Sequence, residues 1–425
     1  MFYNIRKKRN PQVNDMQRTI LHSDCNSFYA SVESLYHPEY RGQPLAVGGD
    51  EQERRGIILA KNPLAAQCGV KTGEALWQAK KKCPALVILH PDFELYSRFS
   101  KMTREIYLEY TDLVEPFGLD EAWLDVSESR LLKGDGVNIA NELRERIKCE
   151  LGITVSIGVS FNKIYAKLGS DYKKPDAVTV INRDNYKNIV YPLPVSDLLF
   201  VGKHTKERLV GMGINTIGEL AESSEKLMTM VFGKNGPVLR KYAAGEDDSP
   251  VERYGNCAPV KSVGNSTTAH RDLTSNKDAK IIFMNLAESV SARMKAQGLY
   301  GRVITIGIRD NRLHWISKQR VLPNSTNNCF EIAREAMMLF EKNYDWRLPL
   351  RGLSISMSEL DDASAPEQMG IFPVYTNHER EEKLDSALLD IKRRFGKASV
   401  QPALMLTDKE LAGIEMRDKT DGGSK

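Results

Sequence analysis

Cysteine is scarce in this sequence and follows no pattern. The chain of 425 residues has six cysteines and seven histidines, and neither type forms a C-x-x-C, H-x-H or H-E-x-x-H motif. This spacing argues against a disulfide framework and against a zinc site, and we expect reduced thiols in a cytoplasmic protein. The cysteines lie at positions 25, 68, 83, 149, 257 and 329.

Long apolar runs are also missing. No run of about 18 apolar residues occurs, so we expect no membrane span. The first residues, MFYNIRKKRN, are basic, but no apolar segment follows them, which argues against a secretory signal. We predict that residues 1–17 form a disordered basic arm.

A strong excess of one charge is absent from the chain as a whole, which carries a net charge of only +4. The distribution is uneven, however. Residues 256–360 contain 15 Lys and Arg against 9 Asp and Glu, whereas residues 361–425 contain 10 against 13. A regional basic excess is typical of a nucleic-acid-binding face, and ordinary fluctuation in composition is the alternative.

The order of predicted elements indicates an α+β fold with several domains, and the length suffices for two to four. Helical patterns joined by Gly-containing turns begin near residue 194, and a separate set of strands and helix begins near 256. The strands and helices of the first part alternate without a strict βαβ period. Strands are expected at 19–23, 44–47, 56–60 and 153–160, and helices at 27–36, 73–82, 96–110, 138–151, 163–172 and 379–395. The centre of 113–127 alternates with a period of two, which indicates a strand or hairpin.

Carboxylates stand at the ends of apolar strands. Asp24 follows the strand in ILHSDCNSFYASVE, and Asp120 and Glu121 are adjacent in GLDEAWLDV. In the ordinary interpretation, one of two adjacent strand acids is exposed and the other is salt-bridged. In the chemical interpretation, carboxylates from two strands hold a hard ion such as Mg²⁺, and Lys163 at a helix start holds phosphate. Such a group would serve metal-assisted phosphoryl or nucleotidyl transfer.

Four segments together resemble a known family. DCNSFYASVE, GLDEAWLDV, GVSFNKIYAKLGSDYKKP and KSVGNSTT are similar, in this order, to motifs of the Y-family translesion DNA polymerases, especially their polymerase IV and polymerase V branches. The resemblance runs from about residue 19 to 400 and implies a right-hand polymerase. It implies a palm at 18–35 and 95–180, small fingers at 36–94, a helix-hairpin-helix thumb at 181–250, an α+β little finger at 256–360 and a tail at 361–425.

The activity implied by this resemblance is error-prone, template-directed DNA synthesis, by a monomer acting on primer–template DNA and dNTP. Asp24, Asp120 and Glu121 match the catalytic, metal-binding acids of the family, and the main-chain carbonyl of Cys25 matches a further metal contact. The implied cofactor is a pair of Mg²⁺ ions, for which Mn²⁺ can substitute.

Nucleotide contacts are implied in the same way. Tyr29, with Phe28 beside it, matches the aromatic residue that stacks under the incoming sugar and excludes a 2′-hydroxyl. Phe28 also fits an ordinary core position. Lys163 matches the lysine that grips the triphosphate.

One segment departs from the family pattern. In AKNPLAAQCGV, Pro63 and Ala66 stand where the family has a tyrosine and a basic residue on the triphosphate. Lys61 or Lys71 could substitute for them. The departure puts catalytic efficiency in doubt more than the reaction class, because the acids are present.

DNA contacts are implied in two regions. VGKHTKERL resembles the start of a helix-hairpin-helix, with Gly202 and Lys203 as phosphate contacts and His204 where a second glycine is usual. The alternative there is a structural helix pair. In the little finger, basic and hydroxyl residues are expected to follow the DNA backbone: Lys261, Ser262, Ser266, Thr268, Arg271, Arg302, Arg309 and Arg351.

A short peptide in the tail completes the resemblance. QMGIF, with Gln368, Met369, Ile371 and Phe372, is similar to the family's sliding-clamp-binding peptide. Two rival functions remain open from the sequence. A palm-type nucleotidyl cyclase also uses paired acids, and the departure in the fingers is compatible with a non-catalytic DNA-binding relative.

Overall fold

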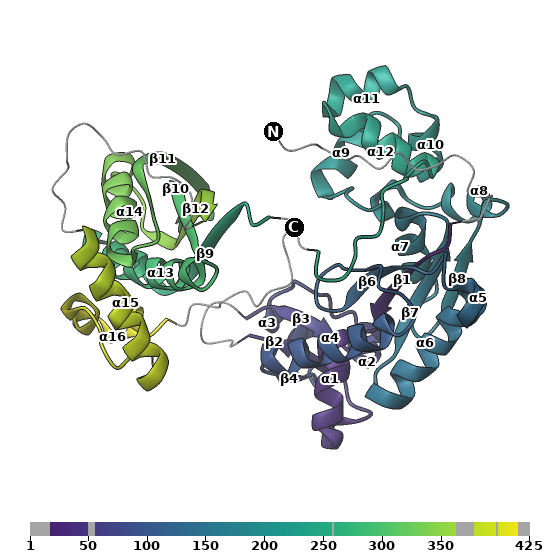
Figure 1. Ribbon diagram of the computed structural model, residues 1–425, viewed down its shortest axis with the longest axis horizontal. Helices are drawn as coiled ribbons and strands as arrows, with labels where there is room; N and C mark the ends of the chain where they lie inside the picture. The colour runs from purple at the N-terminus through teal and green to yellow at the C-terminus, as the bar shows by residue number, and fades with distance from the viewer. Residues whose placement is uncertain (1–17, 50–55, 257–258, 363–377, 397, 415–425) are drawn as a thin grey trace, which may run out of the picture. The chain divides into compact units, whose positions relative to one another are not determined.

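The computed structural model describes residues 18–49, 56–256, 259–362, 378–396 and 398–414 (Figure 1). These residues form two compact units, and along the chain the first ends and the second begins after residue 256. The predicted arm at 1–17 and the clamp-like peptide at 368–372 lie outside the described residues. Among the described helices, none combines the length and apolarity that crossing a bilayer requires.

A five-stranded sheet forms the centre of the first unit. Its strands are β1 (Ile20–Cys25), β5 (Val114–Pro116), β6 (Glu121–Asp125), β7 (Val155–Ser160) and β8 (Val178–Ile181), in the order β5-β6-β1-β7-β8. The helices around it are α1 (Phe28–Tyr36), α4 (Phe93–Leu108), α5 (Arg130–Lys133), α6 (Gly136–Leu151) and α7 (Lys163–Tyr172). The middle strand β1 pairs antiparallel with both β6 and β7, while β7 and β8 are parallel. The sheet is therefore mixed, as the sequence pattern indicates.

Side chains of β1 alternate between the two faces of the sheet, as they do along any strand. Leu21 and Cys25 belong to the core that α4 and α6 share with the sheet. Ile20 packs on the other side, against Ala166 of α7. The same alternation directs His22 and Asp24 toward α7, so the acid at the end of the strand faces a helix rather than open solvent.

A glycine lets α7 lie very close to the sheet. A Cβ atom at Gly158 of β7 would lie 1.9 Å from the carbonyl oxygen of Ala166 and 2.6 Å from the backbone nitrogen of Ser170. Only glycine fits this approach. The helix begins at Lys163 because the side chain of Asn162 caps it, accepting from the Tyr165 backbone N–H at 2.7 Å.

The fingers segment forms a small sheet of its own, in the order β3-β2-β4. Its elements are β2 (Leu45–Gly48), β3 (Ile58–Lys61), β4 (Val87–Leu89), α2 (Pro63–Gln67) and α3 (Leu76–Lys82), with a separate small core. Asn62 caps α2 through the Ala65 backbone N–H, and Pro63 is the first residue of this helix. Proline is favoured at that position because its missing N–H has no intrahelical partner to lose. The start of α2 therefore gives a local structural reason for a proline at position 63.

A helical subdomain follows the sheet. It contains α8 (Tyr186–Val190), α9 (Lys203–Gly211), α10 (Ile217–Glu222), α11 (Glu225–Phe232) and α12 (Asn235–Ala244), which share one core. Gly213, whose φ is +81°, lies in the turn between α9 and α10. Thr216 and Glu219 form a capping box that starts α10.

The second unit has a four-stranded antiparallel sheet in the order β11-β10-β12-β9. Its strands are β9 (Ser262–Leu273), β10 (Leu299–Asp310), β11 (Trp315–Thr326) and β12 (Leu350–Asp362). Helices α13 (Asn276–Ala296) and α14 (Cys329–Asn343) pack on the sheet and supply much of its core. Hydroxyl-bearing side chains alternate with this apolar set along β9 and β12.

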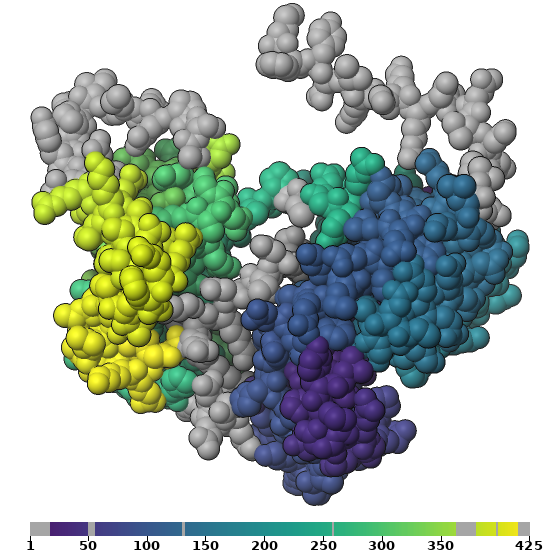
Figure 2. Space-filling view, turned by 60° about the horizontal axis from the view of Figure 1, so that its bottom comes forward, coloured from purple at the N-terminus to yellow at the C-terminus, as the bar shows by residue number. Residues whose placement is uncertain are grey.

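The part of the tail that the structure describes belongs to this second unit. Helix α15 (His378–Phe395) is followed by a 3-10 helix (Ala403–Thr407) and by α16 (Lys409–Ala412), and Met405, Leu411 and Ile414 are buried in the core of the unit. In Figure 2 the yellow tail residues lie directly against the green and teal residues of the unit. The sequence prediction ended this domain at residue 360, but the core continues to Ile414.

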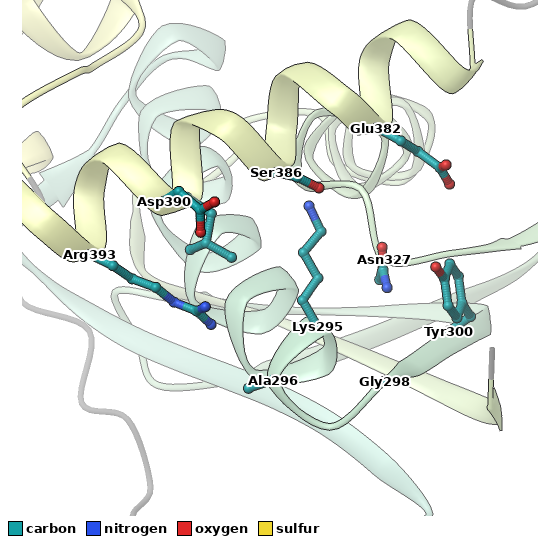
Figure 3. A pocket seen from close by; sticks show the side chains of 10 residues that line it. Lys295, Ala296, Gly298, Tyr300, Asn327, Glu382, Ser386, Asp390 and Arg393 are labelled. Atoms are coloured by element: carbon teal, nitrogen blue, oxygen red, sulfur yellow. The ribbon is translucent and has the colours of Figure 1, made fainter.

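Ion pairs hold α15 in place. Asp385 of α15 pairs with Lys295 of α13 and also accepts the backbone N–H of Cys329, the first residue of α14, at 2.9 Å. Lys392 donates to Glu288 at 2.7 Å. Figure 3 shows Lys295 directed toward α15, beside a cavity of about 560 Å³ that it lines. A buried acid at a helix start is favourable because it meets unpaired N–H groups.

Candidate active site

Strand register brings the predicted acids together. Asp24 is directly opposite Glu121 in the antiparallel pairing of β1 with β6. The next backbone hydrogen bond runs from Cys25 N–H to the Asp120 carbonyl oxygen, at 2.9 Å. Cross-strand neighbours point to the same face of a sheet, so the side chains of Asp24 and Glu121 share the face covered by α7. Asp120, at the turn into β6, lies beside them.

Lysines from α7 and the loop after it neutralise these acids. The Lys167 ammonium lies 3.1 Å from Asp24 Oδ2 and 2.8 Å from Glu121 Oε2, and the Lys174 ammonium lies 2.8 Å from Asp24 Oδ2. Burial by itself would lower the pKa of Lys167, but Asp24 and Glu121 outweigh it and leave that pKa raised. Both lysines are therefore charged at neutral pH.

Asp120 lacks such compensation. Burial, followed by the charges of Asp24 and Glu121, raises the pKa of its carboxyl group to about 6. Several carboxylates close together favour a bound cation, because each raises the cost of ionising the others. Their oxygens, with the Cys25 carbonyl, are the hard ligands that Mg²⁺ prefers.

The side chains as placed are not arranged around a common point. Within the part of the chain that the structure describes, no three His, Cys, Asp or Glu side chains converge as metal ligands would. Asp24 and Glu121 are turned toward lysines instead. The donor set thus fits a hard cation, and binding one requires these carboxylates to exchange ammonium contacts for metal contacts.

His22 is a buried neighbour of Glu121. This buried side chain contacts the Ser170 hydroxyl through Nδ1 at 2.8 Å, and its Nε2 lies 3.3 Å from Glu121 Oε2. Trp123, opposite His22 in the register, meets its ring edge-on at 5.1 Å. Burial and then Lys167 lower the pKa of His22 well below its ordinary value. The ring is therefore neutral, and its one hydrogen bond to a described side chain is the contact with Ser170.

Lys163 lies elsewhere than the sequence prediction suggested. Its ammonium is 2.7 Å from both carboxylate oxygens of Glu115 and 4.6 Å from the ring centre of Trp123. The structure places Lys167 and Lys174 at the acids, and sequence reasoning selected neither. A signal for Lys167 was present, because it lies one helical turn beyond Lys163 on the same face of α7.

The two aromatics after Asp24 have different surroundings. Phe28 is buried in the core of the sheet and its helices. Tyr29 is half-buried and stacks on Tyr96 of α4, with ring centres 4.3 Å apart and 14° between the planes. Phe93 meets Tyr29 edge-on at 5.9 Å. Burial, with Asp120 as the second cause, raises the pKa of Tyr29.

Lys61, the predicted substitute on the triphosphate, is in the fingers sheet. It is the last residue of β3, where its backbone pairs with Ala46, and its ammonium donates to the Thr72 hydroxyl at 3.3 Å. Its role stays a prediction.

The predicted DNA contacts are accessible in the helical subdomain. Gly202 caps the N-terminus of α9, and the Lys203 side chain is 84% exposed. The side chain of His204 is also exposed, so its replacement of a second glycine fills open space rather than a core. The geometry at the start of α9 is compatible with a phosphate contact.

In the second unit, the predicted contacts divide into two groups. Ser262 and Ser266 of β9 lie exposed and opposite Ser358 and Ser354 of β12, so serines form a cross-strand row that the sequence prediction only half identified. Thr268 and Arg351 are half-buried, while Lys261 and Arg302 are exposed.

Arg271 is a correction to the predicted DNA contacts. Its guanidinium donates to Asp278 at 3.0 Å and to Asp408 at 2.7 Å. Because Asp408 caps α16, this arginine links the sheet to the tail. Arg309 lies with its guanidinium carbon 5.7 Å from the ring centre of Trp315.

Comparisons with known proteins agree with this architecture. The models of the impB/mucB/samB family and of its C-terminal domain match residues 23–171 and 260–371. DNA polymerase IV of Acetivibrio thermocellus is 48% identical over 399 residues, which cover 94% of this chain and all of that protein. DNA polymerase IV 1 of Bacillus subtilis is 36% identical over 394 residues, 92% of this chain and 94% of that protein.

A solved Y-family DNA polymerase chimera shares the fold. The comparison has a TM-score of 0.70 at 23% identity and covers 80% of this chain and 98% of the chimera. With nearly full-length relatives and matching family models in both units, the chain belongs to the impB/mucB/samB family of Y-family DNA polymerases.

Proposed function

We propose that this DNA-directed DNA polymerase of the translesion class joins a dNTP to a primer 3′-hydroxyl at Asp24, Asp120 and Glu121. The observation that carries the assignment is the register that sets Asp24 opposite Glu121, with Asp120 beside them. In the proposed reaction the 3′-hydroxyl attacks the α-phosphate in line, the bond from the α- to the β-phosphate breaks and pyrophosphate leaves, without proofreading.

DNA polymerases use divalent metal ions. We assign two Mg²⁺ here, replaceable by Mn²⁺, and Asp24, Asp120, Glu121 and the Cys25 carbonyl would hold them. Held there, such ions would supply charge neutralisation at the attacking and leaving oxygens. The chain's own contribution is orientation, because the register sets Asp24 opposite Glu121 and Lys167 contacts both carboxylates.

Lys174 is our candidate for the triphosphate contact, in place of the predicted Lys163. Lys163 is occupied by Glu115, whereas Lys174 already lies at the acids. The Lys174 side chain is 35% exposed and that of Lys167 only 13%, so Lys174 is the more accessible to a phosphate. Lys167 is better placed to bridge Asp24 and Glu121, because its ammonium contacts both.

Substrate and partner contacts extend this proposal. We assign Tyr29 as the ring beside the incoming sugar, because it lies near Asp120 and remains partly accessible. The start of α9 and the serine row of β9 and β12 are the proposed phosphate-binding surfaces for primer–template DNA. Gln368–Phe372 is the proposed sliding-clamp peptide, and we expect the enzyme to act as a cytoplasmic monomer.

Primer extension tests the assignment. Asp120→Asn and Glu121→Gln should abolish extension in Mg²⁺ and in Mn²⁺ on plain and lesion-bearing templates, while primer–template affinity stays within a few-fold. Asp112→Asn is a matched control, because Asp112 is exposed and its side chain bonds to Arg253. Near-normal extension by Asp120→Asn would refute the metal-ligand assignment.

The same assay separates the rival functions. A palm-type nucleotidyl cyclase would release a cyclic product from a nucleotide alone, and a non-catalytic relative would bind primer–template without extending it. Membership in a family of DNA polymerases counts against both.

A further inference from the structure

Tyr96 of α4 is held at both ends by α1. Its ring stacks on Tyr29, at 4.3 Å and 14°, and its hydroxyl donates to Glu33 Oε1. Tyr29 and Glu33 are four residues apart on α1 and so lie on one face of the helix, one turn apart. Helices α1 and α4 are in contact along this stretch (Figure 1).

The carboxylate of Glu33 is unusual for its place. Tyr96 is fully buried and Glu33 is 4% exposed, and the other buried residues of α1 are apolar. A buried acid is costly unless it is hydrogen-bonded. The Tyr96 hydroxyl supplies that bond, and His37, one turn further along, lies 3.8 Å from the second carboxylate oxygen. Burial, then Glu33, raises the pKa of Tyr96, so this hydroxyl keeps its proton and remains a donor.

The position of Tyr29 depends on this arrangement. One face of its ring rests on Tyr96, and Phe93 meets it edge-on at 5.9 Å. Phe93 also meets Tyr96 edge-on, at 5.8 Å, so the three rings pack as a group. No described residue forms a hydrogen bond with the Tyr29 hydroxyl, so ring packing orients this side chain. A shift of Tyr96 would therefore be passed to Tyr29.

We infer that Glu33 is a positioning residue for sugar selection, which acts by fixing Tyr96 and, through the stack, the ring of Tyr29. The inference rests on the proposed role of Tyr29 beside the incoming sugar. Core packing alone does not require a carboxylate at Glu33, and this role accounts for its presence. To exclude a single hydroxyl group, the tyrosine ring must be held in position to within a fraction of an ångström. Stacking alone allows a ring to slide, so a hydrogen bond that fixes Tyr96 also fixes the ring stacked on it.

The test compares sugar selectivity among variants of the full chain with primer–template and Mg²⁺. The readout is the ratio of kcat/KM for a dNTP to that for the matching rNTP. Tyr96→Phe keeps the stack and removes the hydroxyl, and Glu33→Leu keeps the size and removes the acceptor. Each should lower the ratio about tenfold, the rate equivalent of one charge-assisted hydrogen bond.

Additivity and rescue distinguish positioning from general stability. The double variant Glu33→Leu with Tyr96→Phe should be no less selective than either single variant, because both remove one bond. Glu33→Gln retains an acceptor oxygen and should restore most of the selectivity. Tyr165→Phe is the matched control. It removes another buried hydroxyl, which is bonded to the Ala243 carbonyl at 2.9 Å and does not belong to the group of Tyr29, Phe93 and Tyr96.

Two results would overturn the inference in distinguishable ways. If Tyr96→Phe lowers turnover of dNTP and rNTP equally, Glu33 serves folding and not selection. If Tyr29→Ala itself leaves the ratio unchanged, the proposed role of Tyr29 fails and the inference falls with it. Should Glu33→Leu fail to fold, Tyr96→Phe, which lacks only one oxygen atom, decides the question alone.

Discussion

Gly158→Ala tests how closely α7 must approach the sheet for the site to form. The added Cβ would lie 1.9 Å from the Ala166 carbonyl oxygen and 2.6 Å from the Ser170 nitrogen. Both are backbone atoms, so no side-chain rotation relieves the contact. Restoring an ordinary separation of 3.4 Å requires α7 to move by about 1.5 Å, the difference between 3.4 and 1.9 Å.

This movement has consequences for both stability and chemistry. Overpacking of this kind costs about 1–3 kcal/mol, which outweighs the gain of about 0.5–1 kcal/mol that replacing glycine in a strand usually brings. Lys167 lies 2.8 Å from Glu121 and moves with α7, so a 1.5 Å shift breaks that contact. Misplacement by about 1 Å can cost about 100-fold in rate.

Thermal melting and single-nucleotide extension measure the two effects on one preparation. We expect the melting temperature of the first unit to fall by about 2–10 °C and kcat to fall at least about tenfold. Gly211→Ala in α9 is the matched control, because nothing lies within 4 Å of its added Cβ. Unchanged melting and extension for Gly158→Ala would refute the close packing of α7 on β7.

Three further predictions address the lysines and the tail. Lys174→Ala should raise KM for dNTP about tenfold, whereas Lys163→Ala should mainly lower the melting temperature, because it leaves Glu115 without its cation; steady-state kinetics showing the reverse would restore Lys163 to the triphosphate. Leu411→Ala should destabilise the second unit by about 2–5 kcal/mol in denaturant unfolding, since Leu411 is fully buried; no change would mean that the tail is dispensable. Ile371→Ala with Phe372→Ala should remove stimulation by a sliding clamp at unchanged clamp-free extension, because losing a buried anchor costs about 2 kcal/mol or more; loss of clamp-free activity would contradict the clamp assignment.

Local patterns in the sequence were sufficient for much of the fold. Neighbouring residues encode the acids at strand ends, the period-two centre of 113–127 and the helix after Asn162. The structure has strands or a helix at each of these places. Helix α13, by contrast, was not predicted. It is buried on several sides, so its apolar residues do not form the single stripe by which a surface helix is recognised.

The candidate site needed the tertiary structure for its composition. The sequence pointed to Asp24, Asp120 and Glu121, but only the register of β1 with β6 puts Asp24 opposite Glu121. Choosing among the lysines of one helix depends on which turn faces the acids, and that is decided by how closely α7 packs at Gly158. Propensity and spacing carry no information on such an approach.

Contacts between distant parts of the chain were beyond local reasoning altogether. Glu33 and Tyr96 are 63 positions apart, and Arg271 and Asp408 are 137 apart. A charged residue in a sequence pattern normally indicates an exposed face, so each of these was expected at the surface or overlooked. The sequence by itself determined most of the elements, the acids and the family motifs, because these depend on residues close along the chain. The packing of distant segments decided which charges pair in the interior. It also decided that the tail completes a core.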